Sequence, residues 1–108
     1  MNTNPVILYS KRFDRDFNEI LRYLRQNFSE SAANVVLDKV FDTIEELIEN
    51  PERYPPEPQL SHLGNYRVIR LKKSPYKIFY NYTGSEIRIL RIFHSKRDFN
   101  RIFKRYKF

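Results

Sequence analysis

The chain has no cysteine, no tryptophan and only two glycines among its 108 residues. Without cysteine there can be no disulfide framework, no thiolate metal site and no cysteine nucleophile. The two glycines, Gly64 and Gly84, stand far apart, so the chain lacks the glycine-rich loop that cradles phosphates. No apolar run approaches the roughly 20 residues of a membrane-spanning helix, and no basic segment precedes an apolar one at the start, as in a secretion signal. We therefore expect a cytoplasmic protein with no membrane partner.

Histidine is also scarce, since His62 and His94 are the only two. They lie far apart in the sequence, which does not favour a metal-binding pattern. Nothing in the sequence indicates the activated serine of a hydrolase, and the carboxylates gather in the predicted helices rather than as a catalytic pair. We expect neither a metal nor a cofactor.

What the chain does contain is aromatic and basic. Nine Phe and eight Tyr, within a hydrophobic fraction of 41%, supply the core of one folded domain spanning residues 1–108. The net charge of +7 is unevenly divided. Residues 1–60 hold seven Lys or Arg and eleven Asp or Glu, whereas residues 61–108 hold thirteen and two. Such asymmetry indicates an anionic partner for the second half, whether nucleic acid, an acidic protein segment or a membrane surface.

The first half predicts a strand and two helices. Residues 6–10 form a short apolar run typical of a strand, and Ser10 can cap the helix that follows. One apolar stripe of 3.6-residue period runs along this helix, comprising Phe13, Phe17, Ile20, Leu21, Leu24 and Phe28. Its other side, which includes Asp16, is expected to face solvent. A second helix begins after Ser29 or Ser31 and ends before Pro51, and the short linker predicts an antiparallel helical hairpin.

The second half predicts three strands, Tyr66–Lys72, Tyr76–Tyr82 and Glu86–Phe93, rich in Val, Ile, Tyr and Phe. A proline-rich loop, residues 51–65, precedes them. Residues 95–107 combine a capping-box pattern with an aromatic stripe, which predicts a short C-terminal helix. The predicted fold class is α+β: an N-terminal strand and an antiparallel helical hairpin packed on a small antiparallel sheet. Strict alternation on the last strand places Ile87, Ile89, Arg91 and Phe93 on one face.

The predicted sheet is unusually basic, and its cations suggest two kinds of chemistry. Arg and Lys neutralise phosphates or carboxylates, and Tyr can stack on unpaired bases. The candidate residues for binding RNA or an acidic protein are Arg67, Arg70, Lys72, Lys73, Tyr80, Arg88, Lys96 and Arg97. RNA cleavage through a 2′-hydroxyl would need a proton-transfer group and cations, for which His94, Lys77 and Arg91 are the candidates. Alternatively, His94 has no catalytic role and ends a strand, where it caps or packs.

The order of these patterns, with YRVIRL, YKIFYNY and IRILRIFHSKRD after a helical hairpin and an Asn50-Pro51 loop, resembles the RelE/ParE superfamily of type II toxin–antitoxin toxins. The resemblance covers essentially the whole chain. It implies the α+β fold described above and a cognate antitoxin, acidic and partly disordered when free, that wraps and neutralises the toxin.

The resemblance leaves the target open between two classes. RelE-like members cut mRNA on the ribosome without a metal, whereas ParE-like members bind and poison DNA gyrase. The nucleases usually carry Arg where this chain has Lys77, and their C-terminal Tyr falls near Ile102 or Phe103, with Tyr106 one turn later. These departures and the long hairpin favour a ParE-like toxin, although a His near the end of the last strand, as at His94, also occurs in nucleases. A basic nucleic-acid-binding domain without toxicity is the third hypothesis.

Overall fold

The computed structural model describes residues 4–58 and 66–96. The elements are β1 (Val6–Tyr9), α1 (Lys11–Asn27), α2 (Glu30–Glu49), β2 (Tyr66–Arg70), β3 (Tyr76–Tyr82) and β4 (Glu86–His94). The predicted C-terminal helix, and with it Arg97, lies outside the described residues. Within the described residues, no helix has the length and apolar character needed to cross a membrane.

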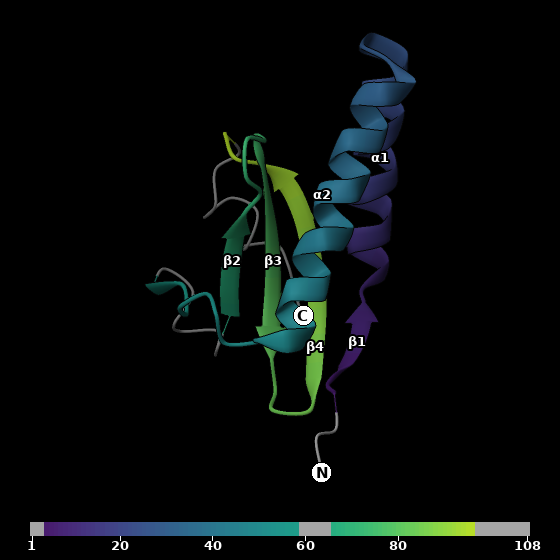
Figure 1. The fold of residues 1–108 in the computed structure, drawn as a ribbon. Coiled ribbons are helices and arrows are strands. Elements are labelled where there is room, and N and C mark those ends of the chain that lie inside the picture. Colours follow the sequence, from purple (N-terminus) through teal and green to yellow (C-terminus); the bar gives the residue numbers. More distant parts are fainter. Residues whose placement is uncertain (1–3, 59–65, 97–108) are drawn as a thin grey trace.

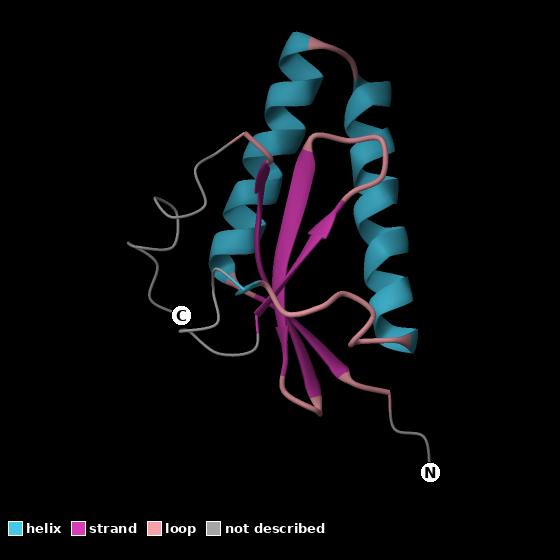
Figure 2. Ribbon diagram, turned by 90° about the vertical axis from the view of Figure 1, so that its left-hand side faces the viewer, coloured by secondary structure: helices cyan, strands magenta, loops and turns pink. Residues whose placement is uncertain are grey.

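The fold has two layers, a four-stranded sheet and the helical hairpin beside it (Figures 1 and 2). The strand order is β1-β4-β3-β2. β2, β3 and β4 pair antiparallel, as predicted, whereas β1 pairs parallel with β4. The sheet is therefore mixed, because the hairpin carries the chain away from β1 and back before β2 begins. The α+β class predicted from the sequence is confirmed.

Both helices begin where the sequence predicted. The Ser10 hydroxyl accepts a hydrogen bond from the Phe13 amide at 2.9 Å, and the Ser29 hydroxyl accepts one from Ala32 at 3.0 Å. Each satisfies a backbone donor that the first helical turn leaves unpaired. Ser10 lies between β1 and α1 and connects both to β4. Its hydroxyl donates to the Leu90 carbonyl at 2.6 Å, and its amide donates to the Ile89 carbonyl at 3.0 Å. α1 thus starts level with Leu90 of β4.

The core lies between the hairpin and the sheet. Apolar side chains from one stripe of each helix meet the inner face of the three long strands; they include Leu21, Leu24, Val36, Val40, Ile44, Leu47, Ile69, Ile78, Ile87, Ile89 and Ile92. Phe79 and Phe93 are also buried, although they do not belong to this cluster. Phe79 stacks on Tyr66 with ring centroids 5.3 Å apart, so the outer face of the sheet is partly covered too.

A β-bulge in β4 overturns the predicted alternation of its faces. Tyr80 pairs with Ile89, yet the preceding Phe79 pairs with Arg91, which leaves Leu90 as the extra residue. Past the bulge each side chain lies on the face opposite to the one that strict alternation predicts, so that Ile92 joins Ile87 and Ile89 in the core. The prediction that Ile89, Arg91 and Phe93 share a face is therefore wrong, because one inserted residue reverses a period of two.

Candidate functional site

The predicted basic residues separate into exposed and buried groups. Arg70, Lys72, Lys73, Arg88 and Lys96 are exposed, whereas Arg67 and Arg91 retain only 6% and 4% of their accessible surface. The Arg88 guanidinium lies 2.8 Å from a carboxylate oxygen of Glu86 on the same strand. A cation can meet a polyanion directly only where solvent reaches it, so the exposed group is the one available to a partner.

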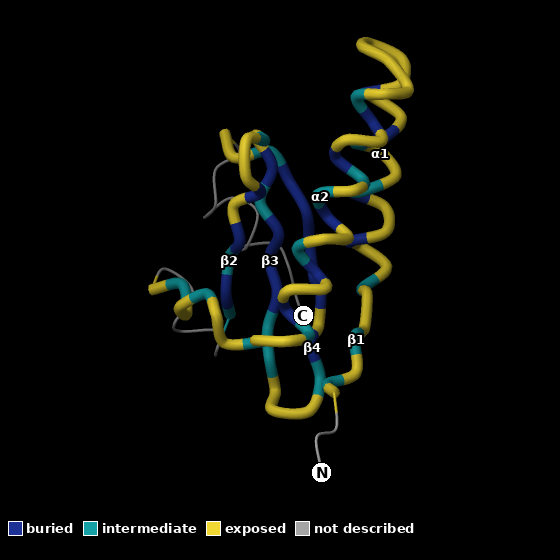
Figure 3. The backbone as a smooth tube through the Cα atoms, viewed as in Figure 1, coloured by how far each residue is buried: buried dark blue, intermediate teal, exposed yellow. Residues whose placement is uncertain are grey.

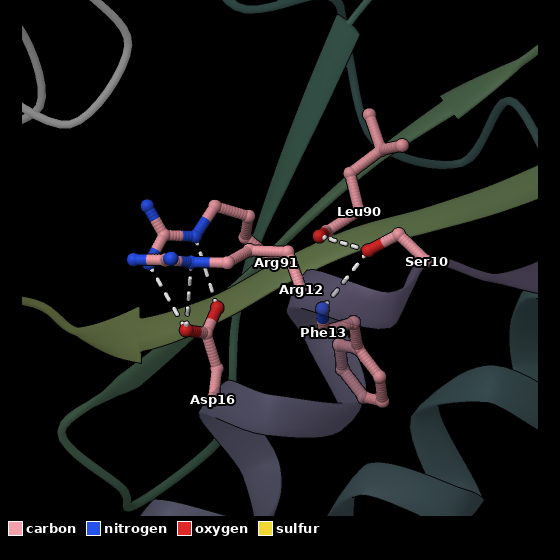
Figure 4. Close-up of polar contacts among 6 residues, drawn as sticks. All are labelled: Ser10, Arg12, Phe13, Asp16, Leu90 and Arg91. Atoms are coloured by element: carbon pink, nitrogen blue, oxygen red, sulfur yellow. Dashed lines mark hydrogen bonds and ion pairs between the residues drawn. The ribbon is translucent and has the colours of Figure 1, made fainter. Parts of the chain in front are cut away.

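Arg91 is held by a carboxylate that the sequence placed in solvent. Its Nε and one terminal nitrogen donate to the two carboxylate oxygens of Asp16 at 2.9 and 3.0 Å, in the two-pronged geometry that suits Arg (Figure 4). Arg12, one turn earlier on α1, lies 3.5 Å from the same carboxylate. Asp16 is only 7% exposed, so its prediction as a solvent-facing residue is wrong. The pair fastens α1 to β4.

Arg67 and Tyr80 hold the loop that follows α2. The Arg67 guanidinium donates to the carbonyls of Glu52 and Tyr54, and the fully buried Tyr80 hydroxyl donates to the Pro51 carbonyl at 3.0 Å. Tyr80 therefore lies in the core, with its ring shielded from solvent. Both residues, predicted to bind RNA or antitoxin, are placed by the fold to position residues 51–54.

Tyr80 should be among the last tyrosines to ionise. Burial raises its pKa to about 12 from the ordinary value of 10.0. Because the neutral form is favoured in the folded state, this contribution to stability is fully present below pH 10.0 and is lost as the pH rises toward about 12. Tyrosinate absorbance during an alkaline titration should show a late phase that Tyr80→Phe removes. A Tyr80 that titrates at the ordinary value of 10.0 would contradict this placement.

The three residues predicted for RNA cleavage do not converge. His94 pairs with Tyr76 and meets its ring edge-on, with centroids 5.8 Å apart, on the side of the sheet that faces the hairpin. Lys77 follows Tyr76 in an extended strand, so its side chain projects from the opposite face. Arg91 is enclosed with Asp16. The sheet therefore lies between His94 and Lys77, and Arg91 is engaged in its ion pair with Asp16.

The helical hairpin extends past the sheet that it covers (Figure 1). α1 starts level with Leu90 and has 17 residues, a length of about 26 Å at 1.5 Å per residue. β4 ends four residues later at His94, which is about 13 Å along the strand. The far half of the hairpin therefore has no strand beneath it, and it is mostly exposed (Figure 3). Leu24 and Val36 are still buried there, whereas Tyr23, Phe28 and Val35 are left largely exposed.

An apolar groove opens where the overhanging hairpin meets the β2–β3 turn. It encloses about 440 Å³. Its walls come from the end of α1, the start of α2, the turn and the end of β4, and include Tyr23, Phe28, Val35, Val36, Pro75, Tyr76 and His94. Phe28, Tyr23 and Val35 are 68%, 54% and 51% exposed, and the Phe28 and Tyr23 rings meet edge-on at 6.1 Å. We call this feature the hairpin groove.

Cations border the hairpin groove. Lys39 of α2 and Lys73 of the turn line it, and the Lys39 ammonium donates to the Lys73 carbonyl at 2.9 Å, which bridges the two walls. At the β4 end, His94 Nδ1 accepts a hydrogen bond from the Lys96 amide at 3.1 Å. An apolar floor with a basic border suits a segment that is apolar on one side and acidic on the other.

A smaller hollow of about 290 Å³ continues the groove along α1. It shares Tyr23, Tyr76 and His94 with the hairpin groove and adds the acidic residues Asp16 and Glu19. Burial raises the pKa of Tyr76, with a further contribution from Tyr23. Among the described residues, no three His, Asp or Glu side chains are grouped to hold a metal ion.

Residues 7–99 match the family model described as the ParE toxin of the type II toxin–antitoxin system parDE. The chain belongs to the ParE toxin family. No curated protein matches it, but eleven chains of solved structures do. One is a chain of the chromosomal ParDE toxin–antitoxin system from P. aeruginosa, with a TM-score of 0.69 at 18% identity, over 83% of this chain and 95% of that one. The superfamily predicted from the sequence is confirmed, and the family within it is ParE.

Sequence patterns alone missed the hairpin groove. The helical period predicts Phe28 as a core residue, yet it is among the most exposed apolar side chains of the described residues. The available indication was length, because the predicted helices were longer than the strand segments beside them. The apolar stripe of α1 extends past the end of β4, and this leaves Phe28 exposed.

Proposed function

We propose that this ParE family protein arrests growth by binding DNA gyrase and is neutralised by a cognate antitoxin, acidic and partly disordered when free. Membership of the ParE family supports this target, because gyrase is the target expected of a ParE-like toxin. The cytoplasm, where gyrase works, is the compartment that this function requires.

One observation carries the choice of a binding toxin over an mRNA nuclease. The candidate residues for RNA cleavage are dispersed: His94 faces the hairpin, Lys77 projects from the other side of the sheet, and Arg91 is enclosed by Asp16. General acid–base chemistry needs its groups within about 3 Å of the reacting atoms, and cations stabilise a phosphorane only when aimed at it. A protein that acts by binding has no such requirement.

The hairpin groove is the proposed site for a segment of the antitoxin. Its exposed aromatic rings supply apolar contacts of the kind that dominate protein interfaces. The cations at its border, Lys39 and Lys73, and the overall charge of +7 favour an acidic partner. Such an interaction should weaken as salt screens its charges, within a Debye length of about 8 Å at physiological ionic strength.

Two assays run in parallel test the proposed target. The purified toxin should inhibit supercoiling by gyrase, and it should leave mRNA intact on translating ribosomes. His94→Ala should change neither result, because the proposed mechanism assigns His94 no chemical step. Cleaved mRNA that is lost in His94→Ala would instead establish the ribosome-dependent endoribonuclease. No effect in either assay, with normal growth on expression, would favour a basic nucleic-acid-binding domain without toxicity.

A further inference from the structure

The β2–β3 turn contains a backbone conformation that its residue does not favour. Lys73 has φ of +53°, and no other non-glycine residue of the described chain has a positive φ. The left-handed region brings Cβ close to the carbonyl oxygen, so turns usually place Gly or Asn there. The turn itself is closed by the Leu71 amide, which donates to the Tyr76 carbonyl at 3.0 Å. Nothing in this closure requires a lysine side chain.

The backbone of Lys73, by contrast, has a role that any residue would fill. Its carbonyl accepts the hydrogen bond from the Lys39 ammonium, and this contact fixes the turn against α2. Lys73 is exposed and lines the hairpin groove, as Tyr23 and Phe28 do. Unfavourable backbone conformations cluster at functional sites, where the surrounding structure holds them in place.

We propose that Lys73 is a specificity-determining residue, whose ammonium binds one carboxylate of the antitoxin segment seated in the hairpin groove. This inference rests on the proposed function. The Lys39 bridge holds the backbone of the turn against α2, and this fixes the point at the groove from which the Lys73 side chain extends. A partner with an apolar anchor and a carboxylate at the matching distance gains both contacts, whereas a partner without that carboxylate leaves the cation unpaired.

The test compares Lys73→Gly with Lys72→Ala. Both variants remove one exposed positive charge from the same turn, but Lys72 does not line the hairpin groove. The probe is the purified product of the neighbouring gene, which is expected to encode the antitoxin, with affinity measured by titration calorimetry. Lys73→Gly should weaken binding about tenfold, the usual order for losing one charge-assisted contact. Lys72→Ala, which loses only long-range attraction, should weaken it less than about threefold.

Thermal unfolding of the same variants separates a binding role from a structural one. Because Gly accepts a positive φ, Lys73→Gly should melt a few degrees higher than the wild type while binding more weakly. Lys73→Asn, which also tolerates this conformation, is the second variant and should behave alike. A purely structural lysine would give the opposite result, with lower melting temperature and unchanged affinity, and would overturn the proposal.

Amide substitutions in the antitoxin identify the carboxylate. Each Asp or Glu is changed to Asn or Gln and titrated against wild-type toxin and Lys73→Gly. One substitution should weaken binding to the wild type and have no further effect on Lys73→Gly. Equal effects at every carboxylate would overturn the specific contact while leaving antitoxin binding intact. An antitoxin that does not bind the wild-type toxin would overturn the proposed function, and this inference with it.

Discussion

Asp16→Ala is expected to lower the free energy of unfolding by about 3–5 kcal/mol, the cost typical of removing one partner from a buried ion pair. The substitution leaves the Arg91 guanidinium, only 4% exposed, without the carboxylate that receives two of its hydrogen bonds. It also removes the contact that fastens α1 to β4 beyond the end of β1. Urea unfolding monitored by circular dichroism measures the change.

Two control variants test whether the loss of stability comes from removing one partner of the buried ion pair. Arg12→Ala removes the half-exposed cation 3.5 Å from the same carboxylate and should cost no more than about 1 kcal/mol. Replacing both buried partners, as in Asp16→Leu with Arg91→Met, should recover most of the stability, because neither buried charge then remains. A loss below about 1 kcal/mol for Asp16→Ala would show that the pair does not hold the helix to the sheet.

Phe28→Ala is expected to weaken antitoxin binding by about 2 kcal/mol, roughly thirtyfold, the effect of losing an aromatic anchor at the centre of an interface. Phe28 is 68% exposed in the isolated toxin and lines the hairpin groove beside Tyr23, so most of its side chain is available to contact a partner. Its replacement should therefore cost the fold little. Calorimetric titration with the antitoxin measures the loss.

Phe41→Ala is the matched control for Phe28→Ala. Phe41 also lies on the hairpin and is 51% exposed, but it does not line the hairpin groove. Its replacement removes the same ring from the surface and should leave antitoxin affinity within about twofold. If both variants lose affinity equally, or if neither does, the antitoxin segment does not lie in this groove.

The helices and strands followed from local rules, which explains why the sequence predicted them well. Ser10 and Ser29 cap helices whose apolar period is regular, and Pro51 follows the end of α2 closely. The run from Tyr76 to Tyr82 forms β3 with the predicted bounds. Each of these features depends on residues within one or two turns of chain.

The corrections all concern contacts between distant segments. Asp16 is polar and sits on the polar side of α1, so no local rule distinguishes it from a solvent-facing carboxylate; only its proximity to Arg91, 75 positions away, does. The bulge at Leu90 depends on how β3 and β4 align, and the exposure of Phe28 depends on where β4 ends beside α1. The candidate cleavage residues were separated by the same tertiary arrangement.

Supercoiling by DNA gyrase, assayed with the toxin alone and with toxin plus antitoxin, tests the central claim most directly. We predict inhibition by the wild-type toxin, full relief by an equimolar amount of antitoxin, and no dependence of the inhibition on His94. Gyrase that supercoils normally in the presence of folded toxin would contradict the claim that this ParE family member acts by binding gyrase.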